Sequence, residues 1–520
     1  MLATLLLAAG MIFGVSTGAS AIDFKAHGEW IMSFDYGMNG NATGDGRATG
    51  FGRQGTDEFD ASQRVRLQMD AVASEALSAN VFFELGPASW GKADRGYALG
   101  ADGTNLIKVR RAYIDWMVPQ TDLKIRMGLQ GLALPSFTTK ANAVLDDDVA
   151  AVVASYKFND NVGLTAFWAR LFNDNSDGDT INGSWRNSGY MDNLDAFGLL
   201  LPLTFDGVKV TPWAMYAAIG PDTFRRNGDY LDVVNNNRDG WGNRYNWGAS
   251  QNHIRHGLFP VGGSIHKDGT DASKKLNTYG SAIWAGLTGE VTAFDPFRIA
   301  WDVNYGSVQY DDSRMNRAGW IASLLFEYKM DWGIPGIYGW YASGDDGNPA
   351  NGSERLPYLA PTGNNEFSNF AFSGGKQYWR EAMLSDNMVG TWGIGARLKD
   401  MSFVEDLKHT FHIAYMSGTN STTMTRYMST GRRGNWGTFN GDGNGEFEEP
   451  LYLTTNDHAM EFGLHNAYKM YDNFTINLDA NYIALWLDHS RDVWGNARFN
   501  GKDDTVKDPW NVKLTFVYSF

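Results

Sequence analysis

Apolar and polar residues alternate along many segments of the chain with a period of two. Because successive side chains of a β-strand point to opposite faces, this period predicts strands with one apolar and one polar face. The last twelve residues, 509–520, alternate without interruption. Their apolar face carries Trp510, Val512, Leu514, Phe516, Tyr518 and Phe520. The same pattern predicts strands within 23–35, 64–73, 297–305, 320–328 and 474–486, and few of these runs place a charge on the apolar face.

The connections between these segments alternate in length. Short turns occur at 159–160, 206–207, 294–296 and 471–473, whereas long polar loops occupy 219–277, 344–387 and 418–457. Short turns at one rim and long loops at the other are typical of a β-barrel in the bacterial outer membrane, and a β-sandwich gives no reason for this alternation. The pattern therefore predicts an all-β fold, a transmembrane antiparallel β-barrel of about 18 strands, with about 16 as the alternative because the pattern is weakest near Val149 and Gly336. An even number of strands places both termini on the periplasmic side, together with the short turns, and leaves the long loops extracellular.

Composition supports a large exported β protein. After the N-terminus, no apolar stretch approaches the ~20 residues that a membrane-spanning helix needs. The 520 residues include 0 Cys, which excludes a disulfide framework, thiolate metal sites and haem attachment. Aromatic residues make up 14% of the chain, which suits the aromatic girdles of a barrel. The formal net charge of -15 argues against a nucleic-acid partner, since no basic stripe is present to contact phosphates.

The N-terminus predicts a signal peptide over residues 1–21. Residues 5–15 form a short apolar run, and Ala19, Ser20 and Ala21 provide the small residues that precede a cleavage site. No Lys or Arg precedes the apolar run, which departs from the usual signal pattern and leaves a buried N-terminal helix as the alternative. The remaining residues, 22–520, are predicted to form a single transmembrane β-barrel domain.

The size of the barrel indicates what its interior does. With about eight strands the side chains fill the lumen, whereas roughly 16 to 18 strands leave an aqueous channel. A water-filled pore is therefore expected.

Several segments of the chain, taken in order, carry a family resemblance: 64–68 (RVRLQ), 112–116 (AYIDW), 128–135 (GLQGLALP) and 145–150 (LDDDVA). With the signal-like start, they resemble the outer-membrane homotrimeric porins of sulfate-reducing bacteria, most densely before about Phe158 and at the C-terminal end. The resemblance implies a trimer of barrels, each with its own pore, in contact with outer-membrane lipid and lipopolysaccharide. It also implies a general porin, which allows passive diffusion of small hydrophilic solutes and ions.

The resemblance also suggests where the pore is narrowest. In trimeric porins the loop after the fifth strand folds into the barrel, and here that connection spans 132–147. It carries Asp146 and Asp147, with Asp148 at its edge. Strand phase directs four arginines inward, beside Lys124: Arg64, Arg66, Arg111 and Arg126. An acidic loop that faces a basic wall would produce a transverse field and orient dipolar solutes. The alternatives are lumen arginines scattered along the pore and a solvated turn that caps a strand.

Two further basic residues do not fit the simple alternation. Lys108 and Arg110 fall on the face that next carries Ala112 and Ile114. Either a β-bulge shifts the phase at this point, or both residues lie at the outer rim. The sequence leaves both interpretations open.

Two loops contain spacings that approximate the start of a calcium-binding loop. The candidate ligands are Asn440, Asp442 and Asn444 before Gly445, and Asn173, Asn175 and Asp177 before Gly178. The twelfth positions are Leu451 and Ser184, where a bidentate Glu is required. Asp, Asn and Gly are also common in any polar loop, so a solvated loop is preferred and no cofactor is predicted.

Two other functions compete with the general porin. A solute-specific channel for sugars or organic acids would use inward aromatic residues such as Phe167 and Trp340 as a binding track. An outer-membrane barrel enzyme is less favoured, because a hydrolase needs Ser, His and an acid to converge, and the 9 His are spread over separate segments. His409 and His412 are close in sequence, but a three-residue step in a strand places them on opposite faces. No enzyme activity is predicted.

Overall fold

The computed structural model describes most of the chain. The described residues are 22–38, 57–90, 107–139, 141–173, 193–221, 278–348, 351–361, 367–372, 387–424, 453–488 and 507–520, with the short pieces 179–181, 184–186, 223, 254, 257–260, 384 and 490. The predicted signal peptide, 1–21, and the calcium candidates Asn440, Asp442 and Asn444 lie outside them. No helix in the described part of the chain is long and apolar enough to cross a bilayer.

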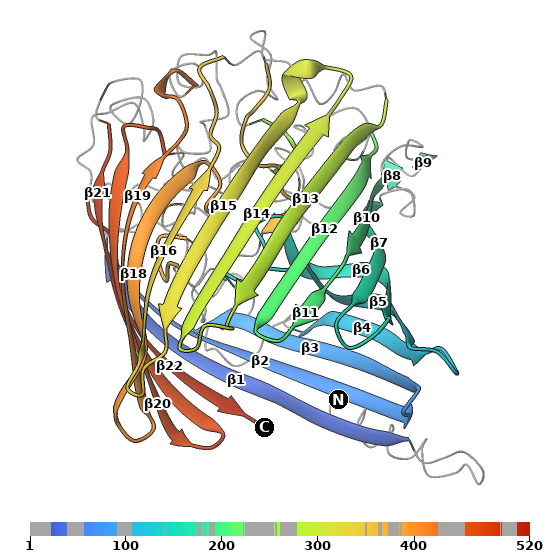
Figure 1. Ribbon diagram of the computed structural model, residues 1–520, viewed down its shortest axis with the longest axis horizontal. Coiled ribbons are helices and arrows are strands. Elements are labelled where there is room, and N and C mark those ends of the chain that lie inside the picture. The colour runs from blue at the N-terminus through green and yellow to red at the C-terminus, as the bar shows by residue number, and fades with distance from the viewer. Residues whose placement is uncertain are drawn as a thin grey trace.

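Eighteen strands of the described chain form a closed antiparallel β-barrel (Figure 1). The first and last strands close it, because Met38 pairs with Trp510 and Glu29 pairs with Ser519. The predicted fold class and the count of 18 strands are confirmed, and the alternative of 16 is excluded. The barrel strands are β1 (Asp23–Met38), β2 (Asp57–Ser74), β3 (Leu77–Ser89), β4 (Ile107–Met117), β5 (Leu123–Ala133), β6 (Leu145–Lys157), β7 (Gly163–Asn173), β10 (Asn193–Leu200), β12 (Val208–Ile219), β13 (Gly280–Val291), β14 (Phe297–Gln309), β15 (Arg317–Tyr328), β16 (Ile334–Ala342), β18 (Thr391–Val404), β19 (Leu407–Gly418), β20 (His458–Tyr471), β21 (Phe474–Trp486) and β22 (Trp510–Ser519).

Four short strands and one helical turn lie outside this set. β11 (Leu203–Phe205) pairs with β12 near its beginning, and β8 (Asp179–Ile181) pairs only with β9 (Ser184–Arg186). β17 (Ala360–Pro361) runs parallel to the beginning of β6. The turn η3 (Ser313–Met315) connects β14 to β15.

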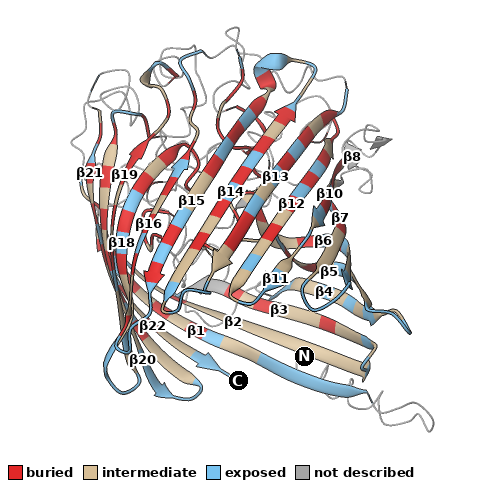
Figure 2. Ribbon diagram, in the orientation of Figure 1, coloured by how far each residue is buried: buried red, intermediate tan, exposed pale blue. Residues whose placement is uncertain are grey.

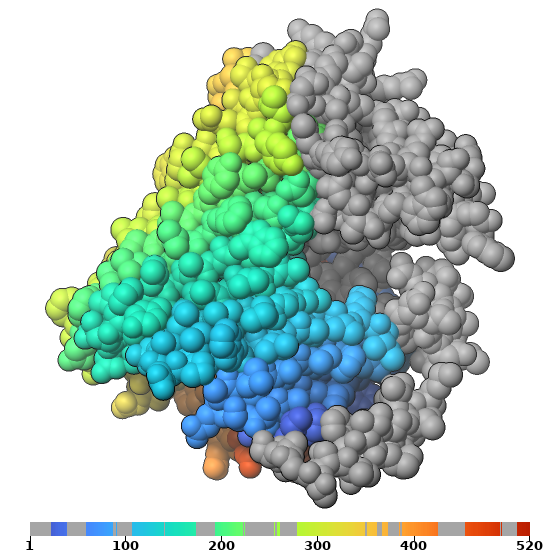
Figure 3. Space-filling view, turned by 90° about the vertical axis from the view of Figure 1, so that its right-hand side faces the viewer, coloured from blue at the N-terminus to red at the C-terminus, as the bar shows by residue number. Residues whose placement is uncertain are grey.

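Short and long connections leave the barrel at opposite rims (Figure 1). Only Asp472 and Asn473 separate β20 from β21, whereas the connection between β12 and β13 runs over 220–279. β1 begins and β22 ends at the short-turn rim, where Gly28 and Phe520 exchange two backbone hydrogen bonds of 2.8 and 3.0 Å. Around the wall the strands follow one another in chain order, from blue through green to yellow in Figure 3. The chain termini of the barrel therefore share one rim.

The two faces of the wall differ in polarity. Buried and exposed residues alternate along β12–β15 in Figure 2. The outward residues are largely apolar, and Ile283, Ile337 and Ile394 are 56%, 59% and 61% exposed. Large rings lie near the rims, among them Phe294 and Phe403 at the short-turn rim, which are 65% and 71% exposed. An apolar outer face with rings near its rims is typical of a wall that faces lipid.

Rings on the inner face lie over glycines of the following barrel strand. In six pairs within the described strands, the ring and the glycine are direct cross-strand partners, and a methyl group built on the glycine would come within 1.9 to 2.5 Å of the ring. The pairs are Phe167 with Gly198, Trp213 with Gly286, Trp284 with Gly306, Tyr338 with Gly395, Trp340 with Gly393, and His412 with Gly463. Because glycine has no side chain, each ring can lie flat against the wall, an arrangement that also protects the glycine backbone.

We predict that Gly393→Ala destabilises the barrel by about 1–3 kcal/mol, the usual cost of overpacking a tight contact. The added methyl would lie 2.3 Å from the Trp340 ring, which therefore has to move. Gly339→Ala is the matched control, because it lies on the outer face of β16, where the nearest atom to the new methyl is 3.2 Å away. Urea unfolding in detergent, monitored by heat-dependent gel mobility, gives the free energy of unfolding of each variant. An equal loss of stability in the two variants would contradict the prediction.

Candidate functional site

Loop 134–144, which connects β5 to β6, contacts the inner face of β14. Asp302 of β14 accepts hydrogen bonds from Ser136 Oγ at 2.9 Å and from the backbone N–H groups of Phe137 and Thr138 at 2.9 and 2.8 Å. The Thr138 hydroxyl also donates to this carboxylate. Arg298, on the same strand, donates to the Phe137 carbonyl at 2.8 Å. Since β14 is not a neighbour of β5 or β6 in the wall, these contacts place the loop inside the barrel.

The beginning of β6 also lies inside. β6 pairs with β7 only from Ala150 onwards, whereas Leu145 and Asp146 pair with β17. β17 belongs to the long connection between β16 and β18, so this part of β6 lies beside a loop rather than beside the next wall strand. Asp146 and Asp147 are thus strand residues, although the sequence placed them in the loop, because the strand begins at Leu145.

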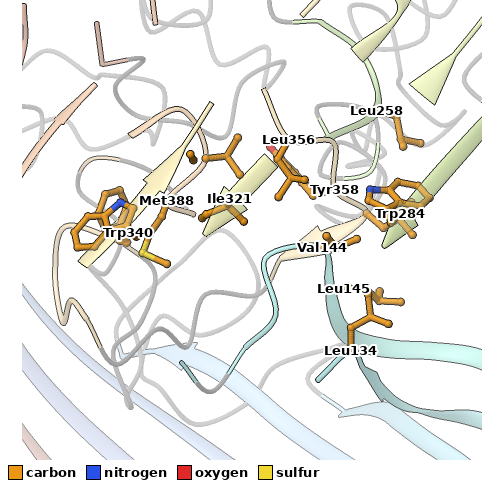
Figure 4. Close-up of a cluster of buried hydrophobic side chains, with 14 of the residues drawn as sticks. Leu134, Val144, Leu145, Leu258, Trp284, Ile321, Trp340, Leu356, Tyr358 and Met388 are labelled. Atoms are coloured by element: carbon orange, nitrogen blue, oxygen red, sulfur yellow. The ribbon is translucent and has the colours of Figure 1, made fainter. Parts of the chain in front are cut away.

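A buried apolar cluster fills one side of the interior. Trp284 of the inner wall donates through Nε1 to the Pro357 carbonyl at 2.8 Å, which ties the connection between β16 and β18 to β13. Figure 4 labels members of the cluster from the wall and from the loops: Leu134, Val144, Leu145, Leu258, Trp284, Ile321, Trp340, Leu356, Tyr358 and Met388. None of these is more than 7% exposed. This side of the barrel also carries charged groups, among them Arg298 of β14, whose side chain is 32% exposed. The opposite wall, β1–β4, is lined by charged side chains.

That wall carries an arginine row, formed by Arg64, Arg66, Arg110 and Arg111. Glu84 accepts hydrogen bonds from Arg66 Nε at 2.9 Å and from Arg110 Nη1 at 3.1 Å. Asp148 accepts from Arg110 Nε at 2.7 Å and from Arg111 Nε at 2.5 Å. Glu29 lies 3.4 Å from Arg66 Nη1 and 3.6 Å from Arg64 Nη2. Positive and negative groups therefore alternate in one network from β1 to β6.

Two carboxylates of the network, Glu84 and Asp148, are less exposed than the guanidinium groups that they bind. The side chains of Glu84 and Asp148 are 9% and 10% exposed, whereas those of Arg66, Arg110 and Arg111 are 25%, 27% and 38% exposed. The carboxylates thus lie behind the guanidinium groups and fix their positions through charge-assisted hydrogen bonds. Gly131 provides space for this arrangement, because a methyl group at that position would lie 2.8 Å from Arg111 Nη2. Glu29, whose side chain is 34% exposed, belongs to the same network, so the surface offered to water combines the guanidinium groups of Arg66, Arg110 and Arg111 with one carboxylate.

A β-bulge in β4 brings Arg110 into the row. The register between β3 and β4 shifts where Phe82 pairs with Arg111 and Phe83 pairs with Val109, which leaves Arg110 as the extra residue. Lys108 is then opposite Glu84, on the inner face. Of the two interpretations that the sequence left open, the bulge is the one found. A bulge redirects side chains in this way because it places two residues opposite one.

Arg126 belongs to a second, separate group. Its guanidinium forms a two-point contact with Asp115, with Nε and Nη2 donating at 2.6 and 2.8 Å, and it lies 4.1 Å from the centre of the Tyr113 ring. Lys124 contacts the same carboxylate at 2.9 Å. The structure therefore joins four predicted residues, Arg64, Arg66, Arg111 and Asp148, in one network and places Arg126 in another.

The aromatic residues considered for a binding track are buried. Phe167 and Trp340 point inward but are only 5% and 4% exposed. Trp340 packs against Phe367 and Phe372, with ring centroids 6.1 and 5.8 Å apart. Neither ring is accessible to a solute in this structure.

Among the described residues, the set most similar to a hydrolytic triad consists of Ser368, Glu461 and His412, but their hydrogen bonds connect them in the wrong order. Glu461 accepts from Ser368 Oγ at 2.6 Å and contacts His412 Nε2 at 2.9 Å. A triad requires the imidazole to lie between the serine and the acid, so that it can take the serine proton. Here the carboxylate occupies the middle position, and His412 cannot act as the base for Ser368.

No family model matches the chain, and no curated protein matches it. Solved structures with a similar arrangement include a BenF-like porin from Pseudomonas fluorescens Pf-5, with 10% identity and a TM-score of 0.49 over 96% of this chain and 98% of that chain. Others are OpdK from Pseudomonas aeruginosa with vanillate (10% identity, TM-score 0.46, 95% and 98% covered) and an anion-selective porin from Comamonas acidovorans (8% identity, TM-score 0.41, 96% and 100% covered). These sequence identities and TM-scores are too low to support an inference about the function of this chain.

We predict that Arg111→Cys reacts rapidly with a charged, water-soluble thiol reagent, whereas Leu145→Cys does not react while the barrel is folded. The Arg111 side chain is 38% exposed, and Leu145 is 0% exposed within the apolar cluster. Because the chain contains 0 Cys, the introduced thiol is the only target. Intact mass after a short exposure in detergent gives the extent of labelling. Protection of Arg111→Cys would show that the arginine row does not face water, and equal labelling of both variants would show that the apolar cluster around Leu145 is open to the reagent.

Proposed function

We propose that the chain is an outer-membrane channel through which small hydrophilic solutes diffuse passively. The observation that carries this proposal is a closed barrel of 18 strands with an apolar outer face and a polar inner wall at β1–β4. A barrel of this strand number is wide enough for water beside its inner side chains. The described inner wall offers charged hydrogen-bonding groups, and no serine–histidine–acid order that would support hydrolysis of lipid is present among these residues.

We further propose that the channel prefers anions, and small carboxylic acids in particular. Three guanidinium groups of the arginine row, those of Arg66, Arg110 and Arg111, are partly exposed and are held by Glu84 and Asp148, which lie behind them. Guanidinium groups bind carboxylates through two parallel hydrogen bonds, and charges at a narrow point of a pore decide its selectivity. This geometry favours the solute-specific alternative for organic acids over an unselective porin. It gives no comparable support for sugars, because the inward rings Phe167 and Trp340 are covered.

The expected assembly and orientation belong to the same proposal. Three barrels associate through their walls in the outer membrane, with lipopolysaccharide around the long-loop rim. Both termini and the short turns lie in the periplasm.

We expect Arg110→Gln combined with Arg111→Gln to lower the ratio of anion to cation permeability by roughly twofold or more, because two cationic groups are lost from the pore lining. Asp148→Asn should raise the same ratio, since it removes the carboxylate behind them. Reversal potentials in planar bilayers under a salt gradient give the ratio. Lys157→Gln is the control, because it removes one positive charge whose side chain is 62% exposed at the short-turn rim.

A ratio that stays at the wild-type value in all three variants would exclude the arginine row as the selectivity element. The same bilayers separate the two kinds of channel. A current that saturates with one small carboxylate supports the solute-specific channel, whereas a current that rises linearly with every salt supports the general porin.

The trimer predicts that purified protein inserts with three equal current steps per particle. Each barrel has its own pore, so the steps should also disappear one at a time under high voltage. The molar mass of the detergent-solubilised protein, from light scattering with subtraction of the detergent, should correspond to three chains. Single steps together with the mass of one chain would overturn the trimer and leave the channel proposal intact.

A further inference from the structure

An ion pair lies on the outer, lipid-facing surface of the barrel. Arg170 of β7 and Asp195 of β10 are direct cross-strand partners, and the next pair on the same face is Trp168 with Phe197. Trp168 and Phe197 are 38% and 49% exposed, whereas Ala169 on the opposite face is 0% exposed, so the ion pair belongs to the outer face. A charged side chain on that face is costly at mid-depth in the lipid and is tolerated near the headgroups.

The ion pair lies towards the long-loop rim. β7 ends at Asn173 and β10 begins at Asn193, and the connection between them leaves at the rim opposite the short turn between β6 and β7. On the other side of the ion pair the outward residues are apolar. Tyr216 of β12 and Ile283 of β13 are in register with Phe197 and are 44% and 56% exposed. The ion pair therefore lies near the edge of the apolar band, at the level of lipid headgroups.

Asp195 holds the guanidinium group of Arg170 in one orientation. Arg170 Nε and Nη2 donate to the two carboxylate oxygens at 2.9 and 3.0 Å. Trp168 Nε1 and Asn193 Nδ2 donate to the same carboxylate at 3.0 and 2.7 Å, and the Tyr279 hydroxyl donates to Asn193 Oδ1 at 2.7 Å. The side chain of Asp195 is 11% exposed and that of Arg170 is 40% exposed. The carboxylate is thus covered by its donors, and the guanidinium group faces outward.

The guanidinium group keeps donors for a ligand. It has five N–H groups, and the two contacts with Asp195 leave three of them. Among the described residues, Asp195 is the acceptor that Arg170 contacts. The Trp168 ring lies beside the charge, with its centre 5.5 Å from Arg170 Cζ. Guanidinium N–H groups match the oxygens of a phosphate, and an apolar ring beside them suits the acyl chains of a lipid.

We propose that Arg170 binds a phosphate group of lipopolysaccharide, on the outer face of β7 and β10. The proposal rests on the orientation given with the proposed function, which places the long-loop rim outside the cell. In that orientation the lipid beside Arg170 belongs to the outer leaflet, where the anionic groups next to the acyl chains are the phosphates of lipid A. The acyl chains of the same molecule then contact Trp168 and Phe197.

The first test measures the binding of lipid A with both phosphates to the folded, delipidated barrel in detergent, by native mass spectrometry. We expect Arg170→Gln to lower the affinity roughly fivefold or more, because a neutral amide cannot form charge-assisted hydrogen bonds with the phosphate. Arg170→Lys keeps the charge and should bind more tightly than Arg170→Gln. Lipid A without its phosphates should bind the wild type more weakly than the phosphorylated lipid does, and should not distinguish the wild type from Arg170→Gln.

Arg314→Gln is the matched control. Arg314 is likewise held by an aspartate, Asp312, through Nε and Nη2 at 2.9 and 2.6 Å, and its side chain is 47% exposed. It lies in the turn η3 between β14 and β15 and not on the outer face of the wall. The affinity of this variant for lipid A should therefore equal that of the wild type.

Two further measurements test the source of the phosphate and the leaflet. Neither phosphatidylglycerol nor inorganic phosphate at the concentration of lipid A should displace it from the wild type, because they lack its set of acyl chains. Asn348→Cys, in the long connection between β16 and β18, should react on intact cells with a thiol reagent that does not cross the outer membrane, since Asn348 is exposed and the chain has 0 Cys. This reaction would place the long-loop rim, and with it Arg170, at the outer leaflet.

Several outcomes would overturn the lipid site. One is a wild type that binds lipid A equally well with and without phosphates, a result that needs no variant. Another is displacement by phosphatidylglycerol or inorganic phosphate, or labelling of Asn348→Cys only after the outer membrane is opened. A folded Arg170→Gln that loses the mass of three chains but keeps its affinity for lipid A would show that Arg170 contacts a neighbouring subunit instead. The binding measurement uses no current, so its failure and a failure of the barrel to conduct are separate results.

Discussion

The structure depends on one constraint, which is that no backbone N–H or C=O group can remain unpaired in lipid. The pairing of β1 with β22 satisfies it by removing both edges of the sheet. Closure with an even number of antiparallel strands then fixes both chain ends at one rim and forces turns and loops to alternate. It also fixes the faces, because a period of two with lipid outside leaves the inner positions free for polar chemistry.

The same rule operates inside the barrel. Loops that fold inward bring backbone groups away from bulk water, and the wall supplies acceptors for them through Asp302 and Glu461. These anchors hold the inward-folded loops beside β12–β16, where the loops pack on rings, and the wall on the opposite side, β1–β4, carries the arginine row. On that wall the buried Glu84 and Asp148 orient guanidinium groups that remain more exposed than the carboxylates. A total charge of -15 therefore says little about the local sign at this wall.

The fold could be predicted from local pattern, because lipid enforces the period of two on every strand. The same alternation also predicted that the side chains of Arg64, Arg66 and Arg111 point inward. Glu29 and Glu84 could have been found by pairing the predicted strands, since each stands directly opposite Arg66 in the register. The bulge at Arg110 could not be decided, because one extra residue changes the phase without a sequence mark. Glu461 and Asp302 were missed because their partners are backbone groups of distant loops, which no side-chain pattern reports.

The rings that lie over glycines restrict how this wall can evolve. Each ring occupies the volume that a neighbouring side chain would fill, so neither position can change size alone. Among homologous sequences, the two positions of a pair such as Trp213 and Gly286 should therefore vary together, with a larger residue tolerated at the glycine only where the ring has been replaced by something small. The pairs lie along the wall from β7 to β20, so such coupled changes would record, in sequence alone, which strands are neighbours.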